Sequence, residues 1–296
     1  MMKNKLLLLP ILIFFASCSK GEKDFDASGV FEAKEIIVSS EVNGKILSLN
    51  IEEGRELEKG QEYGLIDTLQ LYLKRQQLLY SIEAIGGRAI DVNKQIAGLE
   101  EQIRKLKIEK QRVETLLKRN AANQKQLDDI NSNIIVAESQ LSAQKSSFEK
   151  GNKSISSEEA SFRVQVLQIN DQLEKCRIKS PIKGRVLLKY SEQGEITAMG
   201  RPIFKVSDID NMILRIYITS SQLTQIKLNQ EVKVFADFGE ERKEYKGIVS
   251  WISSKAEFTP KSIQVKDDRD NLVYAVKVMV ENDGYLKIGM YADVKL

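Results

Sequence analysis

The 296-residue sequence contains no histidine. Its absence excludes histidine-based acid–base catalysis, Ser-His-Asp triads and the usual zinc, copper and non-haem iron sites. The sequence also lacks a P-loop and a GxGxxG motif after a strand pattern, so nothing indicates a nucleotide-binding fold. A hydrolase that uses only carboxylates stays open, although no motif supports one. We expect no catalytic, cofactor-binding or metal-binding residues.

Cysteines and long apolar runs are equally scarce. The two cysteines are Cys18 and Cys176, and the one long apolar run covers residues 6–15, after two lysines. The run is about half the length of a membrane-spanning helix, so it predicts a signal peptide over residues 1–17 rather than a transmembrane anchor. Cys176 then has no disulfide partner, and we expect it to be a small buried residue.

The residues Phe15-Ala-Ser-Cys18 resemble the lipobox of bacterial lipoproteins, with Phe15 in place of the more usual leucine. The resemblance implies that Cys18 is acylated and tethers the mature protein to a membrane. The net charge of +3 includes the two signal-peptide lysines, and acids and bases are interspersed. This charge pattern does not indicate a nucleic-acid partner.

A glycine pattern occurs twice, with a spacing of 140 positions between the copies. We expect these glycines where the backbone needs a positive φ, between short apolar strands. The repeat predicts one small β-module cut into two halves, residues 35–68 and 178–208. Its glycines are Gly44, Gly54 and Gly60 in the first half and Gly184, Gly194 and Gly200 in the second.

Residues 69–177 carry apolar side chains at alternating spacings of three and four, which is typical of a coiled coil. Asn123 followed by Gln126 has the form of a helix N-cap with its capping-box partner, so we expect a turn near residues 119–123. The two arms are nearly equal, about 75 Å each, and predict an antiparallel hairpin. One continuous helix in a parallel dimer is the alternative, and it would separate the halves of the module.

Glycines interrupt both predicted arms. Gly86 and Gly87 predict a kink or local break near Gly86, while Gly151 weakens the return arm. Because these positions lie at unequal distances from the turn, the sequence does not imply a shared hinge. Ala89 falls on the apolar seam of the outgoing arm.

Residues 209–296 alternate in the manner of short strands, which predicts a small antiparallel β-barrel. Residues 18–34 are a lipid-tethered linker, and the segment 31–38 is a candidate further strand. The predicted barrel strands are 212–219, 231–238, 245–253, 273–281 and 291–296, with one helical turn within 222–227.

Together, the lipoprotein signal, split β-module, inserted hairpin and following barrel resemble the HlyD-type membrane fusion proteins, or periplasmic adaptor subunits. The resemblance implies an elongated mixed α and β fold: a split lipoyl/biotinyl-like β-domain with an inserted antiparallel α-helical coiled-coil hairpin, followed by a small antiparallel β-barrel. Carrier domains of that type display a modified lysine between their halves. Here the hairpin occupies that place, so a carrier role is not expected.

For function, the resemblance implies a non-enzymatic adaptor of a tripartite efflux or secretion system. It would link an inner-membrane transporter to a TolC-like outer-membrane channel in the periplasm of a Gram-negative bacterium. It would also assemble with copies of itself, as a ring, and attach by its lipid to the inner membrane. A coiled-coil envelope scaffold or binding lipoprotein without a transport role is the alternative.

Adaptors that dock to such channels carry an Arg-x3-Leu-x6-Ser/Thr pattern at the hairpin tip. This chain has Arg112, Leu116 and then Asn123, which replaces the hydroxyl residue. Read without the family, the three are an exposed cation, an apolar residue beside the seam and a helix cap.

Residues 251–278 and 286–294 resemble the barrel of adaptors that accompany ABC exporters. The sequence also ends at Leu296, where adaptors of resistance-nodulation-division pumps usually continue into a membrane-proximal domain. Both features imply an ABC permease as partner. Read alone, residues 256–271 are a charged loop.

Overall fold

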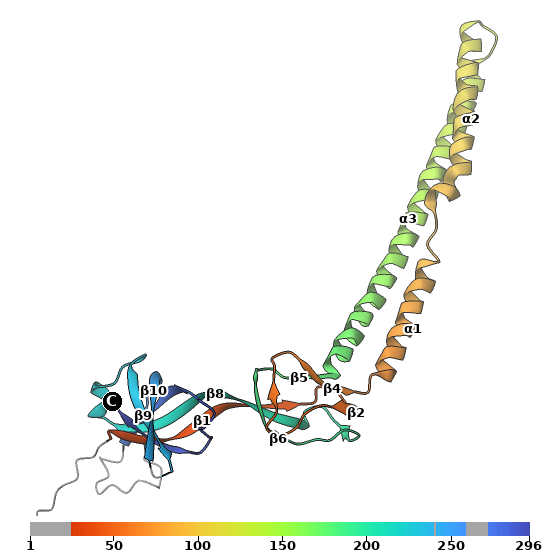
Figure 1. The fold of residues 1–296 in the computed structure, drawn as a ribbon. Coiled ribbons are helices and arrows are strands. Elements are labelled where there is room, and N and C mark those ends of the chain that lie inside the picture. The colour runs from red at the N-terminus through yellow and green to blue at the C-terminus, as the bar shows by residue number, and fades with distance from the viewer. Residues whose placement is uncertain (1–24, 240, 259–271) are drawn as a thin grey trace, which may run out of the picture.

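The computed structural model describes residues 25–239, 241–258 and 272–296. The predicted signal peptide and Cys18 lie outside these residues, as does most of the charged 256–271 loop. A barrel lies at one end of the elongated molecule, the β-module is in the middle, and a helical hairpin projects from the module away from the barrel (Figure 1). Along the described ranges, no helix combines the length and the apolarity needed to cross a bilayer.

The β-module is assembled from both halves of the repeat, as predicted. A four-stranded sheet has the order β5-β4-β2-β7, so strands from the two halves are interleaved, and β3 pairs with β6. Each half therefore completes the sheet of the other. The strands are β2 (Gly44–Leu49), β3 (Glu56–Leu57), β4 (Glu62–Ile66), β5 (Arg177–Lys179), β6 (Gly184–Lys189) and β7 (Ile196–Thr197). The core contains Ile46, Ile51, Leu57, Ile66, Val186 and Phe204.

The insertion is an antiparallel helical hairpin, which confirms the predicted fold class. The outgoing arm consists of α1 (Leu69–Gly86) and α2 (Val92–Lys118), and the return arm is the single helix α3 (Gln124–Lys175). The seam buries Leu78, Ile85, Ile96, Ile103, Val113, Ile134 and Ala137. The outgoing arm breaks after Gly86, as predicted, whereas α3 continues through Gly151. The seam prediction for Ala89 is wrong, because this residue lies in the break and is exposed.

Six strands close the barrel, in the cyclic order β1-β8-β12-β10-β9-β13. Its core contains Phe31, Met212, Leu214, Ile216, Val234 and Val278, all fully buried. A short strand β11 (Glu257–Phe258) adds to β12, and a 3-10 turn, η1 (Gln222–Thr224), follows β8. The barrel strands are β1 (Ala27–Ser39), β8 (Pro202–Thr219), β9 (Glu231–Phe238), β10 (Glu241–Ile252), β12 (Leu272–Glu281) and β13 (Tyr291–Lys295).

The strands β1 and β8 are much longer than the sequence predicts, and they run from the barrel into the β-module (Figure 1). They pair from Gly29–Ile216 to Ser39–Pro202, with one irregularity beside Ala33 and a second between Val38 and Ser39. The polar residues near Ser207 do not end β8, because the pairing with β1 continues through them, with Glu35 opposite Ser207 and Lys34 opposite Asp208. The Ser207 hydroxyl also donates a hydrogen bond to the Lys34 carbonyl (3.2 Å). A paired ribbon, rather than a loose linker, therefore joins the two β-domains.

Candidate functional site

The hairpin tip is a tightly hydrogen-bonded turn. The Asn123 Oδ1 accepts a hydrogen bond from the backbone N–H of Gln126 (3.0 Å), and the Gln126 Oε1 accepts one from the backbone N–H of Asn123 (3.2 Å). This is the complete capping box that the sequence suggests, and it fixes the first turn of α3. At the other side of the turn, Asn120 has a φ of 53°, a conformation that asparagine tolerates at helix ends.

The other two residues of the predicted docking pattern lie on α2 close to this turn. Arg112 and Leu116 are four residues apart, so they lie one above the other on the same face of the helix. Leu116 is half-buried, while Arg112 is exposed and pairs with Glu109 (3.7 Å). The structure thus places all three pattern residues near one end of the hairpin. Their role in channel docking stays a prediction.

Four glycines of the repeat occupy the positive-φ conformation expected from the sequence. Their φ values are 83° at Gly54, 78° at Gly60, 94° at Gly194 and 83° at Gly200. A β-carbon at any of them would meet no atom within 4 Å, so glycine is needed here for its backbone conformation and not for space.

For Gly44 and Gly184, the expectation of positive φ is wrong, since neither adopts it. Both are instead sites of close approach. A β-carbon at Gly184 would lie 2.4 Å from the carbonyl oxygen of Ser207, and one at Gly44 would lie 2.7 Å from the Cγ2 of Ile66. These two glycines let neighbouring strands of the module pack closely.

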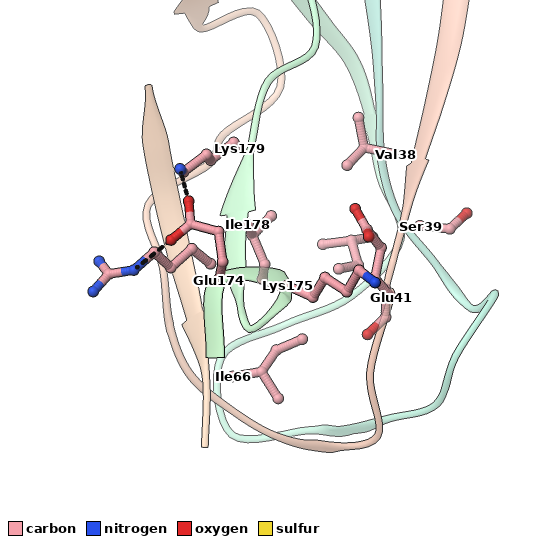
Figure 2. A pocket seen from close by; sticks show the side chains of 11 residues that line it. Val38, Ser39, Glu41, Ile66, Glu174, Lys175, Ile178 and Lys179 are labelled. Carbon is pink, nitrogen blue, oxygen red and sulfur yellow. Dashed lines mark hydrogen bonds and ion pairs between the residues drawn. The ribbon is translucent and has the colours of Figure 1, made fainter. Parts of the chain in front are cut away.

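An open pocket of about 250 Å³ lies where the hairpin joins the module. Figure 2 shows Glu174 on one side of it, bonded to Lys179 and to the Arg177 guanidinium (3.5 Å). On the other side, Lys175 extends toward Glu41. The lining residues are Val38, Ser39, Ser40, Glu41, Ile66, Glu174, Lys175, Arg177, Ile178, Lys179 and Ile203.

Paired charges set the electrostatics of this pocket. The hydrogen bond from Lys179 lowers the pKa of Glu174, and the hydrogen bond to Asp171 (2.7 Å) raises the pKa of Lys175. Both groups therefore stay ionised around neutral pH, and neither is poised to exchange a proton there. The pocket has the character of a structural joint between hairpin and module.

Cys176 is the C-cap of α3 and is 1% exposed, in agreement with the prediction that it is a small buried residue. It donates a hydrogen bond to the carbonyl of Gln172 (3.3 Å). Burial raises the pKa of Cys176, which keeps the sulfur protonated and unreactive at neutral pH. Within the described ranges, no cluster of three or more His, Cys, Asp or Glu residues could hold a metal ion.

Sequence reasoning missed one residue, Asn152, which contacts the break in the outgoing arm. Its Nδ2 donates to the Ile90 carbonyl (2.7 Å), and its Oδ1 accepts from the Ile90 backbone N–H (2.9 Å). The residue next to Gly151 therefore lies against the break in the outgoing arm, although α3 itself is unbroken at Gly151. An asparagine beside a mid-helix glycine was the available signal.

Comparisons with known proteins agree with this architecture. Residues 34–208 match a family model described as the RND MFP barrel-sandwich hybrid domain. Relatives include a UPF0194 membrane protein of Yersinia enterocolitica, which is 25% identical over 90% of this chain and 88% of its own length. Another UPF0194 membrane protein, from Acidithiobacillus ferridurans, is 24% identical over 99% and 95%, respectively.

Two solved structures share the fold. The first is MacA from Actinobacillus actinomycetemcomitans, with a TM-score of 0.52 and 19% identity, covering 90% of this chain and 76% of that one. The second is the membrane fusion protein Spr0693 from Streptococcus pneumoniae R6, with a TM-score of 0.51 and 16% identity, covering 91% and 97%. At these identities, the likeness bears on the fold alone.

Proposed function

Because the chain belongs to the RND membrane fusion protein (MFP) family, whose barrel-sandwich hybrid domain matches residues 34–208, we propose that it is a non-enzymatic periplasmic adaptor of a tripartite efflux or secretion system. The observation that carries the proposal is the capped helical hairpin, which leaves and re-enters the β-module at one point. The 52 residues of α3 span about 78 Å at 1.5 Å per residue. That length suits a bridge between two membranes.

At the tip, we assign Arg112, Leu116 and Asn123 to contact with a TolC-like outer-membrane channel. The capping box uses the side-chain oxygen of Asn123, but its NH₂ group makes no hydrogen bond to any described residue. This group can donate a hydrogen bond to a channel, as a serine or threonine hydroxyl would. The replacement of the hydroxyl residue is therefore compatible with docking.

At the other end, we assign the barrel to an inner-membrane transporter of the ABC type. The matched family model ends at residue 208, before most of the barrel, so the assignment rests on the barrel sequence from Trp251 onward. Phe258 belongs to this stretch, is 78% exposed and offers an apolar contact for the transporter.

An acylated Cys18 places the barrel next to the inner membrane. Phe25 packs on the outer wall of the barrel, 5.1 Å from the Phe235 ring and 4.4 Å from the Arg242 guanidinium. Phe25 comes seven positions after Cys18, and seven residue steps reach about 25 Å at most. The tether thus holds the barrel close to the bilayer, with the hairpin directed away from it.

Copies of the chain form a ring around the transporter in this proposal. The side of α1 that faces away from α3 supports the ring, because it carries three large apolar side chains that are each more than half exposed, Leu69, Leu73 and Tyr80. A helix that is apolar on several sides is typically covered by neighbours.

Site-specific photocrosslinking in intact cells tests the proposal. A photoreactive residue at Leu116 should capture an outer-membrane channel, and one at Phe258 should capture an ABC permease. Lys145, an exposed residue of α3 about 32 Å from the start of that helix, is the control and should capture neither. Capture of an RND pump from Phe258 would refute the transporter class. Correct export and acylation without any transport component at either position would refute the adaptor and favour the envelope scaffold.

A further inference from the structure

The break between α1 and α2 is held in place by contacts from α3. Asn152 forms two hydrogen bonds with the backbone of Ile90, and Arg88 pairs with Glu158 (3.0 Å). A β-carbon at Gly86 would lie 2.6 Å from the Glu159 Oε1, so the end of α1 also sits close against α3. We call the pair formed by Asn152 and Ile90 the latch.

Both ends of the break are capped in the same way as helix termini elsewhere. Arg88 and Ala89 donate backbone hydrogen bonds to the carbonyls of Ile85 and Gly86, which close α1 with a turn. The Asp91 side chain accepts a hydrogen bond from the backbone N–H of Lys94 (3.2 Å) and begins α2 as its N-cap. Residues 89–91 lie outside both helices, and Asp91 has an extended backbone (φ −73°, ψ 98°).

The same sequence also fits an unbroken outgoing arm. Ile85 and Ile96 are both buried against α3, and they are eleven residues apart. Eleven residues make about three turns at 3.6 residues per turn, so both would face α3 in one continuous helix too. Ala89 and Val92 fall between them at spacings of four and three, where a continuous helix would place them on the seam. In the broken arm, Ala89 is exposed.

We propose that residues 87–91 are a two-state joint, which the latch holds in the broken state and which rewinds into helix when the latch opens. Rewinding joins α1 and α2 and buries Ala89 on the seam. Three residues pass from non-helical chain to helix, which shortens the outgoing arm by at most about 5 Å. Because α3 is unbroken and keeps its length, the hairpin bends and its tip moves relative to the β-module. The joint needs only the hairpin itself, so it does not depend on the proposed channel or transporter.

Three substitutions separate the two states. Asn152→Ala removes the latch, and Asp91→Ala removes the N-cap that only the broken state uses. Together they shift the equilibrium toward the continuous helix on the order of a hundredfold. Val92→Pro does the opposite. Val92 is the first residue of α2, a position that accepts proline, but proline in the middle of a continuous helix would break it.

The measurement is the distance between spin labels at Gln77→Cys and Gln102→Cys, both exposed, in the full-length acylated protein carrying Cys176→Ala. In a continuous helix, the two α-carbons are about 38 Å apart. We expect one longer distance in the parent protein. The Asn152→Ala, Asp91→Ala double variant should show a population that is shorter by up to about 5 Å. Adding Val92→Pro should restore the long distance.

Two controls keep the result specific. Asn133 lies on α3, is exposed and makes no side-chain hydrogen bond to any described residue, so Asn133→Ala should leave the distance unchanged. Val92→Pro alone should also keep the parent distance. An unchanged distance in the double variant would overturn the proposal. So would a shortening that persists with Val92→Pro, because proline blocks rewinding but not simple loosening.

Discussion

Gly184 offers the sharpest test of how the split module is held together. A β-carbon there would lie 2.4 Å from the Ser207 carbonyl oxygen and 2.8 Å from its carbonyl carbon, and both atoms belong to the backbone of β8. Neither can swing aside, so the strands β6 and β8 must separate. We expect Gly184→Ala to cost about 3 kcal/mol, from overpacking together with weakened ladder hydrogen bonds.

The repeat supplies a matched control in Gly44. A β-carbon at Gly44 meets only one close atom, the Ile66 Cγ2 at 2.7 Å, and the next is 3.8 Å away. Because a side-chain methyl group can shift, we expect Gly44→Ala to cost about 1–2 kcal/mol. The two substitutions are chemically identical and occupy equivalent positions of the two half-modules.

Amide hydrogen exchange in the peptide that contains β6 measures the local free energy of opening. A loss of about 3 kcal/mol corresponds to exchange roughly a hundredfold faster at these amides. Peptides from the barrel strands β9 and β12 should exchange as in the parent protein. Exchange in β6 within threefold of the parent, or an effect no larger than that of Gly44→Ala, would refute the close-approach argument.

Four further outcomes are expected. Asn123→Ala should weaken the start of α3 by about 1 kcal/mol, seen as faster amide exchange in its first turn, whereas Asn123→Ser should retain the cap; equal exchange in both would contradict the capping role. Gly98→Ala should stabilise α2 by about 1 kcal/mol in thermal unfolding, since the added β-carbon meets no atom within 4 Å, and a lower midpoint would contradict this. The buried Cys176 thiol, with its raised pKa, should react with a thiol reagent at pH 8 only after unfolding, and rapid labelling of the native protein would count against it. The hydrogen bond from Lys243 lowers the pKa of Asp283, so the ionised carboxylate stabilises the fold above the ordinary carboxyl pKa, and this stabilisation is lost as the pH falls through the lower pKa of the folded state. The free energy of unfolding of Asp283→Asn should therefore match that of the parent protein in acid, and a difference between the two that does not change with pH would contradict this.

The sequence predicts the split module well, because the matched glycines recur at a constant spacing of 140 positions. Gly54 and Gly194 show why. A positive φ is a requirement on one residue alone, so it is visible in the sequence as a glycine at that position. Gly184 serves a different need, since the constraint comes from Ser207 on another strand. Nothing in the residues around Gly184 distinguishes close approach from a turn.

The hairpin shows the same division between local and tertiary information. The capping box at Asn123 involves residues three apart and is evident from the sequence. Gly86 and Gly87 predict a break, but its extension to Ala89 is not evident from the sequence, because the apolar spacing continues through that residue. The Asn152 side chain keeps this segment out of the helix by its hydrogen bonds to the backbone of Ile90, which is 62 positions away along the chain.

The full length of the strands β1 and β8 could not be predicted from the apolar pattern, for a further reason. Polar residues such as Ser207 and Asp208 look like the end of a strand when they are read alone. In the structure they lie where two domains meet, and their backbone groups pair with β1. The alternation of apolar and polar residues does not reveal this, because Ser207 is a polar residue that is fully buried within the hydrogen-bond ladder.

The placement of the hairpin inside the β-module has a consequence for the order of folding. The ends of the insertion meet where the backbone N–H of Ile66 donates to the Cys176 carbonyl (2.9 Å), and roughly 110 residues separate these two partners. For a disordered loop of that length, closure costs about 4 kcal/mol in entropy. Coiled-coil contacts near the turn join residues that are close in sequence, so the hairpin can form first at Asn123 and then extend toward the module. Its completion brings the two halves of the module together. Substitutions far out on the arms would then slow the assembly of a β-module that they never touch.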